Sequence, residues 1–157
     1  MGVEIRPAEP ADSDDIYRIY IESWNEGFGY LAGRREFDEH GPARWASTLA
    51  EGETRWWVAE AESGIVGFVG VGPSRDPIEE GLGEVDTIAV DPTHWRSGVG
   101  RALMHRAADA MAGEYREAIL WTAAEYERRH GFYRATGWAR DNGSRNSGAH
   151  VSFRRRL

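Results

Sequence analysis

The segment Val90–Leu103, with the sequence V-D-P-T-H-W-R-S-G-V-G-R-A-L, constrains this chain more than any other part of it. An apolar strand ends before Asp91-Pro92, because a residue that precedes proline avoids the helical region. Gly98 and Gly100 then open an amphipathic helix. The main-chain N–H groups at such a helix start lack intrahelical partners and lie at the positive end of the helix dipole. The segment therefore predicts an anion site, where glycine lets a phosphate approach the backbone.

The residues of this segment alone leave two interpretations open. Arg96 and Arg101 flank the glycines and add positive charge, which favours a phosphate ligand. The segment is not the dinucleotide-binding fingerprint of a Rossmann fold, because Leu103 stands where the third glycine would be and the segment follows a fourth strand. A well-capped helix without any ligand fits the same pattern.

Missing residue types exclude several chemistries. The 157 residues contain no Cys, and all 19 basic residues are Arg. This composition excludes disulfides, thiolate metal ligands, a Cys nucleophile, a Schiff-base lysine and the Walker-type phosphate lysine. The five His residues lack the spacing of metal ligands, so we expect no metal site. The content of 41% hydrophobic and 29% charged residues is typical of a soluble globular protein.

The charge balance and the lack of long apolar runs indicate which partners to expect. A formal net charge of −7 and a pI near 5.3 argue against nucleic acid, whose phosphates require a basic surface. No apolar run approaches the roughly 20 residues that span a bilayer. The opening M-G-V-E-I-R-P is not a secretory signal. We therefore expect a cytoplasmic protein that binds neither nucleic acid nor a membrane.

Hydrophobic periodicity and Gly/Pro punctuation predict strands and helices in mixed order. Strands are expected at Val3–Arg6, Thr54–Ala61, Ile65–Val71, Glu84–Val90 and Glu117–Ala123, with two more within Trp138–Arg154. Helices are expected from Asp12 or Ser13 to Gly27 or Gly29, around Phe37–Leu49, and at Gly98–Ala112 and Glu125–Thr136. The order β-α-α-β-β-β-α-β-α-β-β predicts a mixed α/β fold with a largely antiparallel first half.

The connections follow from the same signals. A loop is expected over Tyr30–Gly33, because Gly27 and Gly29 are interpreted as the end of the first helix. Gly41-Pro42 is expected to interrupt the second helix. The Pro- and Gly-rich stretch Gly72–Gly83 is interpreted as a charged loop.

The segment from Val90 onward resembles the acetyl-coenzyme A signature of the GNAT superfamily of N-acetyltransferases. That signature is a strand ending in Val-x-Pro, then Arg/Gln-x-x-Gly-x-Gly/Ala at the start of a long helix. Val90-x-Pro92 and Gly98-x-Gly100 match it in type and spacing, whereas Trp95 stands at the Arg/Gln position.

Other segments extend the resemblance over most of the chain. The opening Ile5–Ala8 is similar to the family's first strand. Trp57–Gly70 is similar to its hairpin V-A-E…G-x-I-V-G-F. Glu125–Trp138 is similar to its N-x-R-A-x-x-F-Y-x-x-x-G-F, although Tyr126 replaces the Asn and Gly131 lies inside the helix.

The resemblance implies a fold and a co-substrate. The fold would be a strongly twisted mixed sheet of about seven strands flanked by about four helices, in a single N-acetyltransferase domain over residues 3–157. The fourth and fifth strands would splay apart, and acetyl-CoA would lie in that wedge with its pyrophosphate at the helix start. The residues expected to bind it are Ile88, Ala89, Val90, Trp95, Arg96, Ser97, Gly98, Val99, Gly100, Arg101 and Tyr126.

The resemblance also implies catalytic roles for transfer of an acetyl group to a primary amine of a small molecule or peptide. Glu84 occupies the strand position where many members place a general base, and Asp86 on the same strand is a second candidate. Tyr133 matches the Tyr that protonates the departing thiolate. The Ile88 N–H would hold the oxyanion. Because Cys is absent, direct transfer in a ternary complex is the simplest mechanism.

The acceptor site is less defined. Trp24, Phe28 and Tyr30 lie where members shape it, and Trp121 and Thr122 are expected to border the pantetheine arm. A homodimer is expected from family habit alone. Two alternatives stay open: a non-catalytic acyl-CoA-binding or sensing module on the same scaffold, and a different α/β nucleotide binder.

Overall fold

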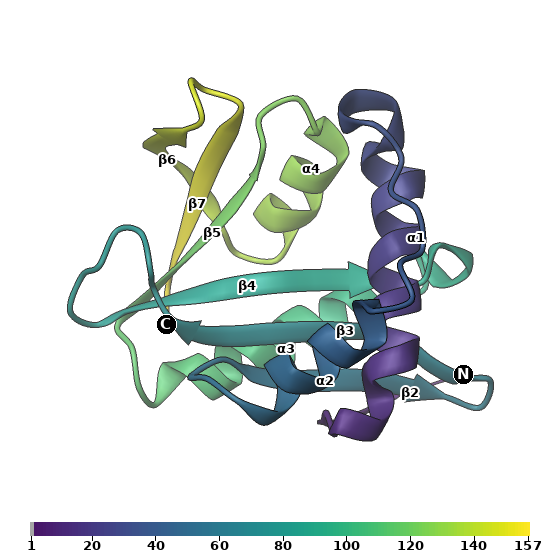
Figure 1. Ribbon diagram of the computed structural model, residues 1–157. Helices are drawn as coiled ribbons and strands as arrows, with labels where there is room; N and C mark the ends of the chain where they lie inside the picture. Colours follow the sequence, from purple (N-terminus) through teal and green to yellow (C-terminus); the bar gives the residue numbers. More distant parts are fainter. Residues whose placement is uncertain (1) are drawn as a thin grey trace.

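The computed structural model describes residues 2–157 and contains one seven-stranded sheet, in the order β1-β2-β3-β4-β5-β7-β6 (Figure 1). The strands are β1 (Glu4–Pro7), β2 (Arg55–Ala61), β3 (Gly64–Pro73), β4 (Leu82–Val90), β5 (Glu117–Ala123), β6 (Ala139–Arg145) and β7 (His150–Arg156). The helices are α1 (Ser13–Ala32), α2 (Gly41–Ala50), α3 (Val99–Ala112) and α4 (Glu127–Ala135). The expected mixed α/β architecture is confirmed, in the expected element order.

Strands β4 and β5 meet at one end and diverge at the other. They pair in parallel over Leu82–Glu84 and Glu117–Ile119 alone, and beyond that point β4 continues to Val90 paired only with β3. Figure 1 shows the two strands separating, with α4 in the angle between them and the far end of α1 beside it. The expected splay is confirmed, and it leaves an unpaired edge of main chain along β4.

Two apolar clusters hold the sheet between layers of helices. On one face, Leu103, Met104 and Met111 of α3 pack with the strand residues Val69 and Leu120. On the other face, Ile16 and Ile19 of α1 pack on the strand residues of a second cluster: Trp56, Val58, Ile65, Phe68 and Ala89. Strand β3 is apolar and buried along almost its whole length because both faces of the sheet are covered there.

Helix α1 continues past the two glycines that were expected to end it. Gly27 is inside the helix and Tyr126 packs against it, so a Cβ there would lie 2.6 Å from the Tyr126 hydroxyl oxygen. The helix ends instead before Gly33, whose φ of +87° breaks the helical path and whose N–H reaches the Gly29 carbonyl at 3.1 Å. The expected loop over Tyr30–Gly33 was therefore wrong.

Helix α2 begins at Gly41-Pro42 rather than being interrupted there. Proline lacks an N–H and has a fixed φ, which suits the first turn of a helix. The expectation of helix from Phe37 onward was wrong for this reason, and Phe37 lies exposed before the helix. The charged loop after β3 is also shorter than expected, because β3 extends to Pro73 and β4 starts at Leu82.

Candidate active site

A cavity of about 490 Å³ lies at the start of α3, between the end of β4 and the first turn of α4. We call it the α3 cavity. It is lined by Ile88, Ala89, Val90, His94, Trp95, Arg96, Gly98, Gly100, Arg101, Tyr126, Arg128, Arg129 and Phe132. Several arginines thus gather at one mouth of an otherwise acidic protein, and their charge suits a phosphate-bearing ligand.

Gly98 gives α3 the start that the sequence predicted. It is the N-cap residue with a φ of +90°, a conformation that strains any residue with a Cβ. The Ala102 N–H reaches the Gly98 carbonyl at 3.0 Å, so the three N–H groups before it begin the helix without intrahelical partners. Arg96, just before it, also has a positive φ of 63°, which is rare for a bulky residue.

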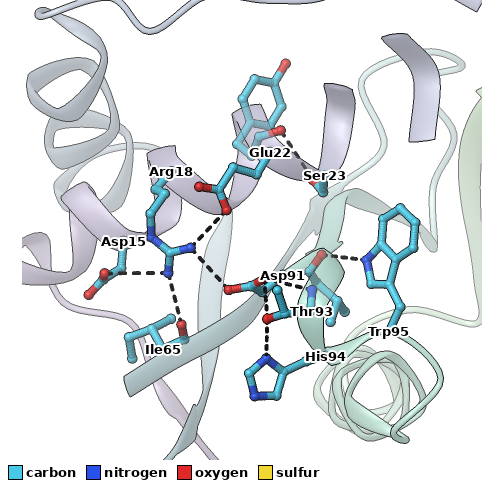
Figure 2. Close-up of polar contacts among 11 residues, drawn as sticks. Asp15, Arg18, Glu22, Ser23, Ile65, Asp91, Thr93, His94 and Trp95 are labelled. Atoms are coloured by element: carbon cyan, nitrogen blue, oxygen red, sulfur yellow. Dashed lines mark hydrogen bonds and ion pairs between the residues drawn. The ribbon is translucent and has the colours of Figure 1, made fainter. Parts of the chain in front are cut away.

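The loop between β4 and α3 is anchored on both sides (Figure 2). Asp91 accepts hydrogen bonds from the Thr93 N–H at 3.0 Å and from Arg18 of α1 at 3.1 Å. Burial opposes ionisation of Asp91, but these bonds outweigh it and hold the pKa of the carboxyl below its usual range. The Trp95 indole N–H donates to the Val90 carbonyl at 2.7 Å, so it covers one acceptor on the free edge of β4.

A second cavity, of about 500 Å³, fills the angle between β4 and β5; we call it the wedge cavity. It is walled by Val85–Ala89 of β4, Leu120–Ala123 of β5, the aromatic side of α1, Arg129 and Tyr133 of α4, and residues 148–150. The two cavities share Ile88, Ala89 and Arg129 in their walls. A ligand held at the α3 helix start could therefore extend along β4 to meet a second molecule in the wedge.

Tyr133 is buried in the wall of the wedge cavity. Its hydroxyl accepts a hydrogen bond from Arg129 at 3.3 Å, and the same Arg129 nitrogen donates to the Ile88 carbonyl at 3.1 Å. The residue expected as the proton donor and the residue expected to hold the oxyanion are thus linked through one guanidinium.

The two candidate bases share one cation. Arg75 contacts Glu84 at 3.3 Å and Asp86 at 2.8 Å. Its hydrogen bond to Glu84 and the charges of both carboxylates raise the pKa of Arg75 against the cost of burial. Glu84 is buried and lies where β4 and β5 are still paired, outside the residues that line the wedge cavity. Asp86 is in that wall, whereas Glu84 is not.

A break in strand register explains the position of Asp86. Gly70 pairs with Thr87 and Val71 with Val85, so Asp86 has no partner on β3. Such a bulge bends a strand and re-aims its side chains. It turns Asp86 to the edge where the wedge cavity and a further hollow beneath α1 and α2 both reach it.

The comparisons with known proteins agree with this geometry. The model of the "Acetyltransferase (GNAT) family" matches residues 13–138. The chain belongs to the GNAT acetyltransferase family. An uncharacterised N-acetyltransferase of Archaeoglobus fulgidus is 31% identical over 134 residues, which cover 83% of this chain and 89% of that protein.

Solved structures of low sequence identity share the GNAT fold. The PaiA N-acetyltransferase of Thermoplasma acidophilum, in complex with coenzyme A, has a TM-score of 0.77 at 16% identity, with all of both chains covered. YncA of Salmonella typhimurium, with its cofactor acetyl-CoA, has a TM-score of 0.78 at 18% identity, covering 100% of this chain and 95% of that one.

Most residues that the GNAT resemblance assigned to the coenzyme lie together. Nine of them line the α3 cavity: Ile88, Ala89, Val90, Trp95, Arg96, Gly98, Gly100, Arg101 and Tyr126. Ser97 and Val99 do not. Val99 is buried in the core, so only its main chain can serve a ligand, and the Ser97 hydroxyl donates to the His94 carbonyl.

The acceptor side of this GNAT protein is brought together only in part. Trp24, Phe28, Trp121 and Thr122 line the wedge cavity, whereas Tyr30 lies on the surface with 75% of its area exposed. Sequence reasoning missed Arg129, which lies three residues after Tyr126 and four before Tyr133. That helical spacing places all three on one face and was the available signal.

No helix within residues 2–157 is both long enough and apolar enough to cross a membrane. The His, Asp and Glu side chains of the same residues form no group of three or more that could hold a metal ion.

Proposed function

We propose that this chain, acting as one domain over residues 3–157, transfers an acetyl group from acetyl-CoA to a primary amine of a small molecule or peptide. One observation carries the proposal: a cavity at a helix start and a cavity in the β4–β5 wedge meet at Ile88, Ala89 and Arg129. Family membership gives the reaction class, and the complexes of PaiA with coenzyme A and of YncA with acetyl-CoA support the co-substrate.

The residues present fit acetyl-CoA. The N–H groups at the start of α3 and the side chains of Arg96, Arg101 and Arg128 would hold its phosphates. The free edge of β4 offers main-chain groups to an amide-bearing arm. The apolar and aromatic walls of the wedge cavity would exclude water from the thioester.

The protein must accept a proton from the amine, stabilise the oxyanion and protonate the sulfur. The amine nitrogen forms a C–N bond with the thioester carbonyl carbon, whose π electrons move to oxygen; the carbonyl then re-forms and sulfur leaves with the C–S electron pair. We assign the proton of the amine to Asp86, directly or through water, and protonation of the sulfur to Tyr133. The Ile88 N–H would stabilise the oxyanion. Glu84 stays the alternative base.

An assay of coenzyme A release across amines, amino acids, aminoglycosides and peptides tests the proposal. We expect at least one acceptor to be acetylated, with intersecting rather than parallel double-reciprocal plots, because no Cys is present to carry an acyl group. Tight acetyl-CoA binding without transfer to any acceptor would favour the sensing module. Thermal stabilisation by NAD or ATP but not by coenzyme A would favour another nucleotide binder.

Replacing Tyr133 by Phe tests the proton donor. We expect kcat to fall roughly 100-fold, because a positioned general acid contributes about 10²–10⁴ to the rate. The affinity for coenzyme A, measured by equilibrium titration, should stay the same, because the change removes one oxygen from the wedge and nothing from the α3 cavity. Unchanged turnover would exclude Tyr133 as the acid.

A further inference from the structure

Arg129 stands where the two cavities join. It projects from the first turn of α4, lines both the α3 cavity and the wedge cavity, and is half-buried. One of its nitrogens, Nη1, donates both to the Ile88 carbonyl and to the Tyr133 hydroxyl. The guanidinium is therefore between the expected oxyanion donor and the expected proton donor.

This arginine has no carboxylate partner, unlike the half-buried Arg6, Arg18 and Arg154. Each of those three forms an ion pair with an Asp or Glu. Arg129 forms none with the carboxylates of residues 2–157, and its neighbours are the rings of Phe28, 5.7 Å from its Cζ, and Tyr126, 5.9 Å away. A guanidinium stays charged at every pH at which proteins fold, so its charge is uncompensated.

Placing an unpaired cation among aromatic side chains costs desolvation energy, which a partner of opposite charge would offset. The bonds to the Ile88 carbonyl and the Tyr133 hydroxyl both use Nη1, and no carboxylate within residues 2–157 takes the donors on Nε and Nη2. Arg129 lacks a negatively charged partner. Acetyl transfer creates negative charge, first on the carbonyl oxygen and then on the sulfur.

We propose that Arg129 is a catalytic residue, whose guanidinium stabilises the oxyanion and the departing thiolate of the acetyl transfer. The proposal rests on the proposed function and adds a side-chain cation to the main-chain donor of β4. Nη1 stays on the Ile88 carbonyl and the Tyr133 hydroxyl, which fixes the direction of the other donors. A donor that is already oriented needs no rearrangement when the charge develops.

Kinetics of three Arg129 variants test this role. Arg129→Met should lower kcat roughly 100-fold or more, the loss typical of one oxyanion donor, and change the acceptor KM by less than about threefold. Arg129→Lys should recover part of the loss, because it restores the charge without the planar donor set. Guanidinium ion added at millimolar concentration should partly rescue Arg129→Ala. Arg134→Gln removes an exposed arginine from the same helix and should leave kcat unchanged.

Binding of coenzyme A supplies a readout that needs no acceptor. A thiol such as that of cysteine ionises near a pKa of about 8.5, so the wild type should bind coenzyme A more tightly as the pH rises from 7 to 9. Arg129→Met should lose that increase, and S-methyl coenzyme A should bind independently of pH in both proteins. This result would hold even if the wild type acetylated no acceptor, so it separates failure of this role from failure of the proposed function.

Three results would overturn the role. Unchanged kcat and unchanged pH dependence of binding in Arg129→Met would show that the charge is not used. A rise in acceptor KM at constant kcat would make Arg129 an anchor for the acceptor. Tighter acetyl-CoA binding with faster turnover would make it an obstruction that the substrate displaces.

Discussion

Arg75 forms ion pairs with both Glu84 and Asp86, so variants of the two carboxylates are needed to tell which one acts as the base. Glu84 also accepts a hydrogen bond from the Arg75 backbone N–H at 3.2 Å, which fixes it to the loop after β3. Asp86 has the bulged position on the wall of the wedge cavity. These contacts support our proposal that Asp86 is the base and that Glu84 has a structural role.

We expect Asp86→Asn to lower kcat roughly 100-fold, because a positioned general base contributes about 10²–10⁴. Glu84→Gln should keep most of the activity, because an amide still accepts the bond from the Arg75 N–H. Steady-state kinetics with a saturating acceptor distinguish the two. The opposite ranking of the variants would assign the base to Glu84.

Site residues that belong to a recognisable sequence motif could be predicted from the sequence. Residues whose role depends on their contacts in the folded protein could not. Gly98 was predictable because its positive φ is tied to the helix start. For Arg129 the sequence offered only its helical spacing to Tyr126 and Tyr133, and that spacing does not say which of the neighbouring charged residues lacks a carboxylate partner. The choice between Glu84 and Asp86 depended on a bulge. Strand β4 is largely buried on both faces and does not alternate, so it has no alternating pattern in which one extra residue would show as a change of phase.

At the scale of the element, two glycines with open space around them, one at the start of α3 and one inside α4, are expected to change stability in opposite directions when replaced by alanine. Gly98→Ala should destabilise the protein by about 1–2 kcal/mol, because its φ of +90° strains any Cβ. Gly131→Ala should stabilise it by about 0.4–1 kcal/mol, because this glycine lies inside a helix with no atom near its Cβ position. Urea titrations measure both; a shift of the same sign in the two variants would contradict the assignment.

The contact between α1 and the start of α4 shows why the end of α1 could not be predicted. Gly27 and Tyr126 are far apart in sequence, and the ring of Phe28 lies 4.4 Å from that of Tyr126. Glycine is usually a signal to end a helix, but here it allows a tyrosine to approach the helix surface. The interpretation of a local signal was overridden by a tertiary contact.

That contact can be tested with a double-mutant cycle. Gly27→Ala should destabilise by about 1–3 kcal/mol, because the new Cβ would lie 2.6 Å from the Tyr126 hydroxyl oxygen. Tyr126→Phe removes that oxygen and leaves ring carbons at 3.2 and 3.3 Å, so the double variant should recover part of the loss. Strict additivity of the two free energies of unfolding would mean that the residues do not interact.

For the whole molecule, two buried carboxylates predict how stability depends on pH. The hydrogen bonds from Arg6, at 2.9 Å each, and the charge of that arginine hold the pKa of Asp12 below its usual range, and the pKa of Asp91 is lowered as well. A lowered folded-state pKa adds stability that is present above the unfolded pKa of about 3.9 and is lost as the pH falls further. The free energy of unfolding should therefore decrease below about pH 4.

Asp12→Asn is the matched control for this prediction. It should destabilise the protein at pH 7 by about 1–3 kcal/mol, because Arg6 loses a charged hydrogen-bond partner. Its stability should then fall less steeply than that of the wild type between pH 4 and pH 2. Parallel curves for the two proteins would mean that Asp12 does not contribute to the acid dependence.

The ladder between β4 and β5, limited to Leu82–Glu84 and Glu117–Ile119, has a mechanical consequence for the molecule. It is the apex of a V: the two strands are joined by hydrogen bonds there and are not paired with each other toward the open end. An amide-bearing arm lying along the open arm of that V would stand in the place of an eighth strand. The substrate would then be, for the length of one turnover, a structural member that joins the two halves of the sheet.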